Sequence, residues 1–218
     1  MIIAIDGPAG AGKSTIAKLL AKELKILYLD TGAMYRAVAL KSIDKNVSPS
    51  DEVAVSELLQ NTSIDVRNEN GVQQVFLDGE NVSDKIREHH VSKVASDISA
   101  VPCVRYKMVQ LQREIASKRD TILDGRDIGT FVLPNAEHKI YLTASVDERA
   151  ERRYKELIMR GVMCERDEIK EDIIRRDFND MNRKLAPLKK AEDAVEIDST
   201  GMTISEVVDK IKSLLGVM

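Results

Sequence analysis

The segment from Gly7 to Ser14 constrains the fold most, because it has the sequence Gly-Pro-Ala-Gly-Ala-Gly-Lys-Ser and joins two segments of different periodicity. Before it, Met1 to Ile5 is a short apolar run rich in β-branched isoleucine, which is typical of a buried strand. After it, apolar residues recur at helical spacing, at Ile16, Leu19, Leu20 and Leu24. The sequence therefore predicts a strand, a glycine-rich loop and a helix, in that order.

This loop matches the Walker A pattern and has the strand-loop-helix context that the pattern requires. In such a loop, successive backbone N–H groups turn inward around a phosphate, and the positive end of the helix dipole adds to the attraction. The Lys13 ammonium would bridge the terminal phosphates, and the Ser14 hydroxyl would ligate Mg²⁺. We therefore expect nucleoside triphosphate binding by Gly7, Pro8, Ala9, Gly10, Ala11, Gly12, Lys13, Ser14 and Thr15.

Further short apolar runs, separated by helical patterns, have the character of buried parallel strands: Ile26 to Leu29, Thr121 to Leu123, Lys139 to Thr143 and Ala194 to Ile197. Two Ser/Thr-x-x-Glu sequences are spaced as capping boxes that begin helices, one at Ser145 with Glu148 and one at Thr203 with Glu206. This alternation predicts a doubly wound α/β layer fold.

One stretch breaks the alternation. Ile64 to Arg67 and Val72 to Leu77 flank Asn70-Gly71, the strongest local signal for a two-residue hairpin turn, so this part is expected to be antiparallel. We interpret the residues from about Thr62 to Asp97 as an insertion into the α/β pattern.

The segment from Asp147 to Lys190 is dense in charge, with 13 basic and 11 acidic side chains among 44 residues. Such a segment is not expected to form core. It predicts a pair of helices that face solvent or a ligand.

Composition excludes several classes of function. The 33 basic and 36 acidic side chains of the 218 residues leave a net charge of −3, which provides no excess of positive charge to bind nucleic acid. Cys103 and Cys164 lie far apart, and the three histidines have no zinc-ligand spacing, so free thiols in a reducing compartment are expected. The start has no basic leader, and no apolar run approaches the roughly 18 residues of a membrane span. We expect a cytoplasmic protein without a membrane partner.

Two polar segments follow predicted strands: Asp30 to Arg36 after the second and Asp124 to Thr130 after the third. In open α/β sheets the carboxyl ends of the strands form the edge that binds ligands. We therefore expect two loops carrying Arg36 and Arg126 to face the same crevice as the phosphate loop. A loop arginine is more often only solvated, but two on this edge favour a small anionic acceptor. An Asn-Lys-x-Asp motif is absent, which argues against a GTPase switch.

These motifs, together with the segment from Arg176 to Leu188, resemble the bacterial cytidylate kinase family, which transfers the γ-phosphoryl group of ATP to CMP or dCMP. The resemblance covers essentially the whole chain. It implies a single kinase domain with the P-loop NTPase fold, built from a five-stranded parallel sheet flanked by helices, an acceptor-side α+β insertion and a mobile helical lid. Its parts would be a core at about 1–30, 118–146 and 190–218, an acceptor-binding lobe at about 31–117 with the insertion at 62–97, and a lid at about 147–170.

The resemblance also implies roles for individual residues. Polar side chains would bind the acceptor, with Arg36 and Arg126 on its phosphate, Ser96, Arg105 and Asp127 on the cytosine, Arg176 and Asp180 on the ribose, and Thr31 and Tyr35 as further contacts. Three cationic residues would act on the transferring group: Lys13, Arg126 and Arg183. Arginines of the predicted lid helix would close over ATP, with Arg149 and Arg153 as main candidates and Arg152 as a further one. ATP and Mg²⁺ are the implied cofactors, and we expect a monomer.

Several alternatives stay open from the sequence. A lid arginine can equally serve a solvated salt bridge, and Asp127 can cap the turn that follows it through backbone N–H groups. Asp124 ends its strand as a Walker B acid would, which makes a water-mediated Mg²⁺ role a hypothesis. The chain can also be a kinase of the same fold for UMP, dTMP, AMP or shikimate, or an ATP-driven switch or binding module.

Overall fold

The computed structural model describes residues 1–69 and 72–217, and the chain divides into two compact units. The first unit consists of Met1–Ile26 and Thr121–Met218, and the second of Leu27–Asp120. Within the described ranges, no helix is both long and apolar enough to cross a membrane.

In the described residues, five strands form one sheet in the order β2-β6-β1-β7-β8, with β1 parallel to β6 and β7, and β7 parallel to β8. The strands are β1 (Ile2–Asp6), β2 (Leu27–Asp30), β6 (Thr121–Gly125), β7 (His138–Thr143) and β8 (Val195–Asp198). Ile3, Ala4 and Ile5 of β1 are fully buried, as expected for a central strand that is covered on both faces. The five predicted strands and their parallel arrangement are confirmed.

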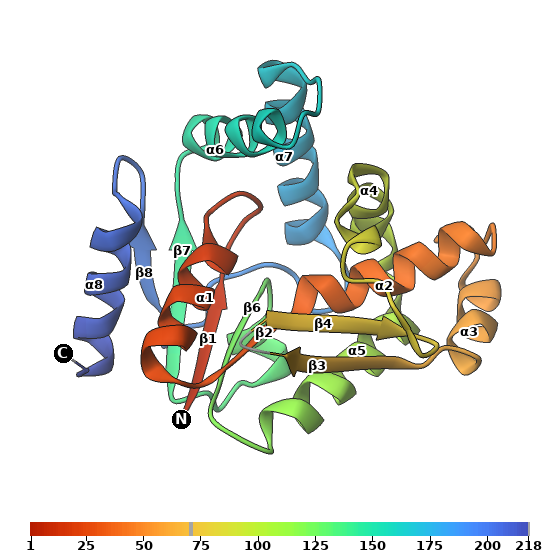
Figure 1. The fold of residues 1–218 in the computed structure, drawn as a ribbon, viewed down its shortest axis with the longest axis horizontal. Coiled ribbons are helices and arrows are strands. Elements are labelled where there is room, and N and C mark those ends of the chain that lie inside the picture. Colours follow the sequence, from red (N-terminus) through yellow and green to blue (C-terminus); the bar gives the residue numbers. More distant parts are fainter. Residues whose placement is uncertain (70–71, 218) are drawn as a thin grey trace. The chain divides into compact units, whose positions relative to one another are not determined.

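Helices of the first unit begin where the sequence indicated. α1 (Lys13–Leu24) follows the glycine-rich loop and packs on β6 and against α8 (Ile204–Leu215) (Figure 1). The capping box of α8 is complete, since Thr203 and Glu206 each bond to the backbone of the other. The Ser145 side chain accepts a bond from the Glu148 N–H at 3.2 Å and so caps α6 (Val146–Met159).

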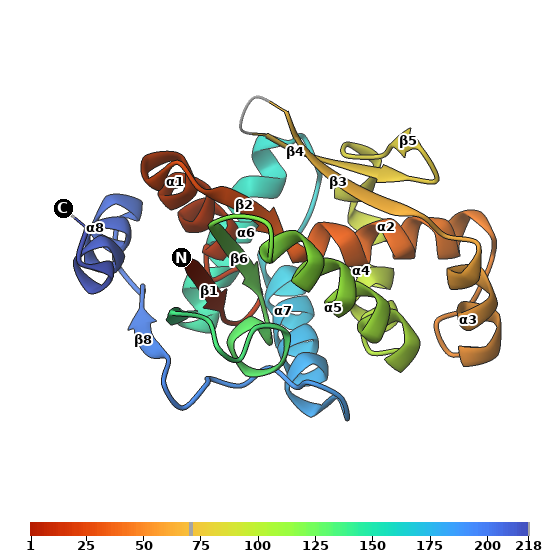
Figure 2. The ribbon, with the colours of Figure 1, turned by 90° about the horizontal axis from the view of Figure 1, so that it is seen from below.

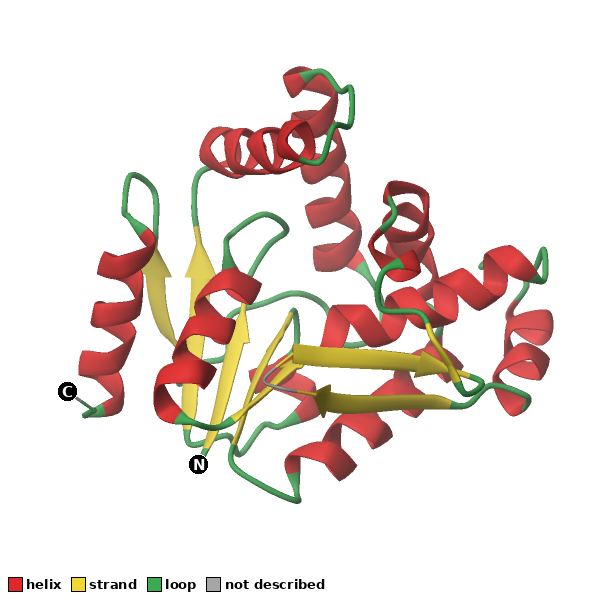
Figure 3. Ribbon diagram, viewed as in Figure 1, coloured by secondary structure: helices red, strands yellow, loops and turns green. Residues whose placement is uncertain are grey.

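The charged segment forms the predicted helical pair of α6 and α7 (Arg166–Asn182), which are joined by a loop (Figure 3). The expectation that this segment forms no core is wrong. The pair buries an apolar cluster of its own, made of Ala150, Leu157, Ile169 and Ile173. It also buries charged side chains that have protein partners, among them Arg149, Asp177 and Asp180. Charge density along a sequence does not tell which charges are paired inside the fold.

The second unit combines helices with a small antiparallel sheet. Its elements are α2 (Thr31–Asp44), α3 (Glu52–Gln60), β3 (Ile64–Glu69), β4 (Val72–Leu77), β5 (Glu80–Asn81), η1 (Lys85–Arg87), α4 (His89–Ile98) and α5 (Pro102–Ala116). Figure 2 shows β3 and β4 side by side, and they pair antiparallel with Glu69 opposite Val72. This confirms the antiparallel prediction, whereas the predicted turn at Asn70-Gly71 lies outside the described residues.

α2 is the central helix of this unit, because it packs against α3, α4, α5 and β4 and fully buries Met34, Ala37 and Val38. The sequence predicted a loop for Asp30 to Arg36, and this prediction is wrong, since α2 begins at Thr31. The physical reason is the N-cap: the Asp30 carboxylate accepts a bond from the Ala33 N–H at 2.9 Å and starts the helix directly after β2.

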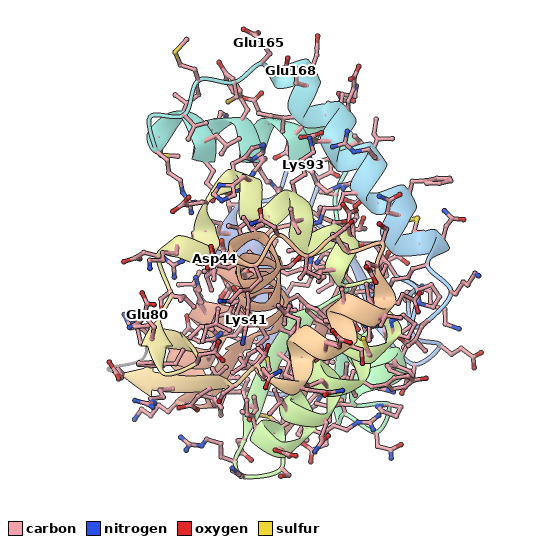
Figure 4. The ribbon with its side chains drawn as sticks, turned by 90° about the vertical axis from the view of Figure 1, so that its right-hand side faces the viewer. Lys41, Asp44, Glu80, Lys93, Glu165 and Glu168 are labelled. Atoms are coloured by element: carbon pink, nitrogen blue, oxygen red, sulfur yellow. The ribbon has the colours of Figure 1, made fainter. Side chains whose placement is uncertain are left out.

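Two lysines of this unit bind the carbonyl groups at the end of α3. Lys41 Nζ donates to the Asn61 carbonyl oxygen and pairs with Asp78 at 2.6 Å. Lys107 Nζ donates to two further carbonyl oxygens, those of Leu59 at 2.6 Å and Thr62 at 2.7 Å. Carbonyl groups at the end of a helix lack the usual partner four residues on, so the ammonium groups add hydrogen bonds and a favourable charge there. In this way α2, which carries Lys41 and Asp44 (Figure 4), and α5 are fixed to α3.

Candidate active site

The glycine-rich loop has a backbone that side chains would not allow. Gly7, Gly10 and Gly12 have positive φ angles of 147°, 75° and 88°. A Cβ atom on Gly7 would lie 1.9 Å from the Leu142 carbonyl oxygen of β7, so that position admits only glycine. The loop is therefore pressed against the sheet at the carboxyl end of β1, and α1 begins directly after Gly12.

Lys13 lies inside this loop with only 5% of its surface exposed, and its Nζ donates to the Pro8 carbonyl oxygen at 2.7 Å. Burial lowers the pKa of the Lys13 ammonium well below its usual value, and the positive charge of Arg126 lowers it further. Arg176 acts in the same direction, while Asp124 and Asp6 oppose it. An anion bound among these cations would relieve their mutual repulsion.

Ser14 and Asp124 supply an oxygen pair beside this lysine. The Ser14 hydroxyl donates to Asp124 Oδ2 at 2.6 Å, and Asp124 is buried at the end of β6. A hydroxyl and a carboxylate are hard oxygen ligands of the kind that Mg²⁺ prefers, so the donor set fits that ion. Among the described residues, no group of three or more His, Cys, Asp or Glu side chains could hold a metal by itself.

Four of the predicted site residues form one partly buried network of ion pairs in the first unit. Arg126 Nε donates to Asp180 Oδ2 at 2.9 Å, and Arg183 Nη2 donates to Asp127 Oδ1 at 3.0 Å. Arg183 also lies 3.8 Å from Asp180, which joins the two pairs. Although burial raises the pKa of the Asp180 carboxyl, Arg126, Arg176 and Arg183 together hold it below its usual value. The sequence predicted each residue, and the structure brings together Arg126 and Asp127, directly after β6, with Asp180 of α7 and its C-cap residue Arg183.

The turn after Asp127 is capped by a different carboxylate. Asp6 at the end of β1 accepts from the backbone N–H groups of Ile128 at 2.8 Å and Gly129 at 2.7 Å. In the described chain, the Asp127 side chain makes no capping bond to this turn, η2 (Ile128–Val132), so the capping alternative for Asp127 is wrong. Sequence reasoning missed Asp6. The one feature of the sequence that could have indicated a role for Asp6 is its place directly after four apolar strand residues.

The lid arginines have protein partners. Arg149 is buried and donates from Nη1 to Asp177 Oδ2 at 2.5 Å and to the carbonyl oxygen of Ala9 in the phosphate loop at 2.8 Å. Arg153 Nη1 pairs with Glu156 on its own helix at 2.8 Å. Arg152 donates to the Ser199 carbonyl oxygen at 2.8 Å. The predicted contacts of these arginines with ATP stay predictions.

In the second unit, Arg36 lies on α2 directly beside the N-cap. Its Nη2 donates to Asp30 Oδ2 at 2.9 Å, and its buried Nε has no hydrogen-bond partner in the described part of the chain. Gln73 of β4 binds the backbone of Asp30 twice. The Asp30 N–H donates to Gln73 Oε1 at 2.7 Å, and Gln73 Nε2 donates to the Asp30 carbonyl oxygen at 3.2 Å. No local pattern could have indicated Gln73, because it lies 43 residues from Asp30.

The predicted base-binding residues of the second unit lie on α4 and α5. Arg105 is 1% exposed, donates from Nη1 to the Ser99 carbonyl oxygen at 3.0 Å, and has its guanidinium carbon 5.5 Å from the centre of the Tyr35 ring. Ser96 Oγ is buried without a hydrogen-bond partner among residues 1–69 and 72–217. A buried hydroxyl without a partner is costly, which favours a ligand contact at this position. Thr31 is buried at the start of α2.

Comparison with known proteins agrees with this geometry. The cytidylate kinase family model matches residues 3–216. A cytidylate kinase of Caldicellulosiruptor bescii is 53% identical over 97% of this chain and 94% of its own length, and one of Clostridioides difficile is 49% identical over 98% of this chain and 97% of its own. An uncharacterized protein of Eubacterium ventriosum shares the fold, with a TM-score of 0.55 and 14% identity over 99% of this chain and 98% of its own. The chain belongs to the cytidylate kinase family.

Proposed function

We propose that this protein transfers the γ-phosphoryl group of ATP to CMP and dCMP, giving ADP with CDP or dCDP. The observation that carries the proposal is the cluster of cations at the phosphate loop. Lys13 is buried in a loop that fits polyphosphate, and the charges of Arg126 and Arg176 both disfavour its protonation. A buried lysine that two arginines repel, beside a phosphate loop, suits a reaction in which two anions meet.

The reaction needs no covalent intermediate on the protein. Phosphoryl transfer is accelerated mainly by holding the donor and acceptor in line and by neutralising the charge that develops between them. Lys13 would lie on the terminal phosphates of ATP, and Arg126 and Arg183 would neutralise the transferring group. Ser14 and Asp124 would hold Mg²⁺, which supplies further positive charge to the phosphates when it is bound.

The acceptor would be recognised by phosphate, ribose and base contacts. Arg36 and Arg126 are proposed to bind the phosphate, and Arg176 and Asp180 the ribose. Ser96, Arg105 and Asp127 are proposed to bind the cytosine. Cytosine has an N4 amino donor where uracil has a carbonyl acceptor, so the Asp127 carboxylate would accept from the first and repel the second.

Water must be excluded during transfer, because otherwise ATP would be hydrolysed. We propose that the lid, α6 and the start of α7, moves when both substrates are bound. We also propose that the protein acts as a monomer in the cytoplasm and in pyrimidine nucleotide metabolism.

The test is a coupled ADP-release assay with Mg-ATP across CMP, dCMP, UMP, AMP and dTMP. The proposal expects release with CMP and dCMP to exceed release with each other acceptor. Faster release with UMP, AMP or dTMP would assign another acceptor to the same chemistry. ADP release that is independent of any nucleoside monophosphate would favour an ATP-driven switch and contradict the proposal.

Base choice is tested separately with Asp127→Asn. The asparagine amide can donate to the uracil carbonyl, so the ratio of kcat/KM for CMP to that for UMP should fall by at least about tenfold, the range expected when a buried hydrogen bond is mismatched. Loss of the charge partner of Arg183 will lower stability as well, but each ratio compares two acceptors on one folded enzyme. A wild-type ratio in the variant would remove Asp127 from base recognition.

A further inference from the structure

One carboxylate ties the phosphate loop to α7. Asp177 accepts from the Ala9 N–H through Oδ1 at 3.0 Å and from Arg149 Nη1 through Oδ2 at 2.5 Å. Arg149 Nη1 also donates to the Ala9 carbonyl oxygen at 2.8 Å, and its Nε donates to the Ala144 carbonyl oxygen at 2.9 Å. The N–H and the C=O of Ala9 are therefore held by α7 and α6, respectively.

Fixing the loop in this way costs the hydration of two charged side chains. Asp177 and Arg149 are both nearly fully buried, and a buried ion pair repays the loss of hydration only when its geometry and further hydrogen bonds are good. Here three backbone groups complete the pair. Neutral hydrogen bonds alone can hold a loop in place, so the buried charges of Asp177 and Arg149 suggest a role beyond fixing this loop.

The sequence position of Asp177 indicates that role. Arg176 directly precedes it, and Asp180, one turn further along α7, accepts a hydrogen bond from Arg126 Nε at 2.9 Å. Asp177 thus connects Ala9, in the loop assigned to ATP, to the helix whose next residues are assigned to the acceptor. A shift of the loop at Ala9 would therefore act on the end of α7 through the Asp177 carboxylate.

We propose that Asp177 is a positioning residue that makes ATP and the acceptor nucleotide bind cooperatively, by locking α7 to the Ala9 peptide of the phosphate loop. The proposal rests on the proposed function, because it takes the loop as the ATP site and α7 as part of the acceptor site. Thermodynamic linkage requires the effect to be reciprocal, so each nucleotide raises the affinity for the other by the same factor.

The test compares Asp177→Asn with a matched control. Asparagine has nearly the shape of aspartate and keeps an oxygen that can accept from the Ala9 N–H, but its amide nitrogen cannot accept from Arg149. Asp172→Asn removes the same charge from the same helix, at an exposed side chain whose partner is Arg175 on the surface. A thermal unfolding curve for each variant shows that it is folded at the assay temperature.

The measured quantity is the coupling factor, which is the dissociation constant of CMP in the absence of a non-hydrolysable ATP analogue with Mg²⁺ divided by the constant in its presence. Calorimetric titration in both orders checks the reciprocity. We expect a factor of about 5 to 150 for the wild type and for Asp172→Asn, and a factor close to 1 for Asp177→Asn. A purely structural role would lower the stability of Asp177→Asn and leave its coupling factor at the wild-type value, and that result overturns the proposal.

A second variant covers the case in which Asp177→Asn does not fold. Arg149→Lys leaves a cation beside the Asp177 carboxylate, but one ammonium cannot replace the Nε bond to Ala144 and the Nη1 bonds to Asp177 and Ala9 together. Its coupling factor should also fall toward 1, and a wild-type value overturns the proposal. Turnover of CMP by the wild type is measured alongside. If the wild type phosphorylates another nucleotide instead, the proposed function fails, and coupling is measured with that nucleotide.

Discussion

Replacement of Asp6 by asparagine should change how the stability of the fold depends on pH. Asp6 is 5% exposed, and burial raises the pKa of its carboxyl to about 6 from the usual 3.8. Bonds from the N–H groups of Gly129 and Ile128 act in the opposite direction, but they do not offset the loss of hydration. The nearby charge of Asp127 raises the pKa further, and that of Lys13 lowers it.

The sign follows from proton binding. Between the unfolded pKa near 3.8 and the folded pKa near 6, the folded protein binds more protons at Asp6 than the unfolded chain does. The contribution of this group to the free energy of unfolding is therefore complete below about pH 4 and is lost as the pH rises through about 6. A shift of about 2 pK units at 1.36 kcal/mol per unit gives a loss of about 3 kcal/mol.

The assay is urea unfolding of the wild type and Asp6→Asn at half-unit steps from pH 4 to 7.5. Other carboxylates, such as Asp180, have lowered pKa values and change stability in the opposite direction, so only the difference between the two proteins isolates Asp6. From the lowest to the highest pH, the free energy of unfolding of the wild type should fall by about 3 kcal/mol relative to that of Asp6→Asn. Asp172→Asn, an exposed change, serves as the control. A difference that stays flat with pH refutes the argument that burial dominates at Asp6.

Two further predictions concern the cations of the site. Lys13→Met should give a native circular dichroism spectrum, because methionine suits the buried position, while kcat falls by at least about 10² to 10³-fold with the loss of one charge at the transferring group; turnover within a few-fold of wild type would contradict the assignment. Arg126→Lys should raise the KM for CMP at least about tenfold more than the KM for ATP, because an ammonium cannot bond Asp180 and form a fork on phosphate at once. Equal weakening of both substrates would remove Arg126 from the acceptor site.

The strands, the phosphate loop and the starts of α1, α6 and α8 could be predicted from the sequence because each depends on residues close together in the chain. Met1 to Ile5 is apolar on both faces, as a central parallel strand requires, and Thr203 with Glu206 forms a capping box within four residues. The start of α2 was missed although its N-cap residue, Asp30, was visible. The place of this segment directly after a strand indicated a loop, but the capping bond and the burial of the helix stabilise α2 despite the low helix propensity of Gly32.

The contacts that organise the site could not be predicted, because they join residues far apart in the chain. Asp6 bonds to a turn 122 residues away, and Asp177 bonds to Ala9 across 168 residues. Asp6 belongs to no local motif, and Asp177, although it lies in the segment from Arg176 to Leu188, has its partners outside that segment. Arg149 was assigned to ATP from its place on the lid helix, and the sequence held no sign that its partners are a second helix and the phosphate loop.

The helical periodicity of α7 nevertheless carries a signal that an analysis of apolar residues alone does not detect. The buried positions of this helix are Ile169, Ile173, Asp177 and Asp180. They form one stripe at helical spacing, in which the first two residues are apolar and the last two are acidic. A helix that only packed would have apolar residues at all four positions, since each buried carboxylate requires a cationic partner to offset its loss of hydration. Surface charges on α6 behave differently, because pairs such as Glu148 with Arg152 are satisfied four residues apart. Where a buried stripe contains carboxylates without partners on the same helix, the cationic partners must come from other parts of the fold. Buried charges of this kind depart from simple apolar packing, and such departures concentrate at functional sites.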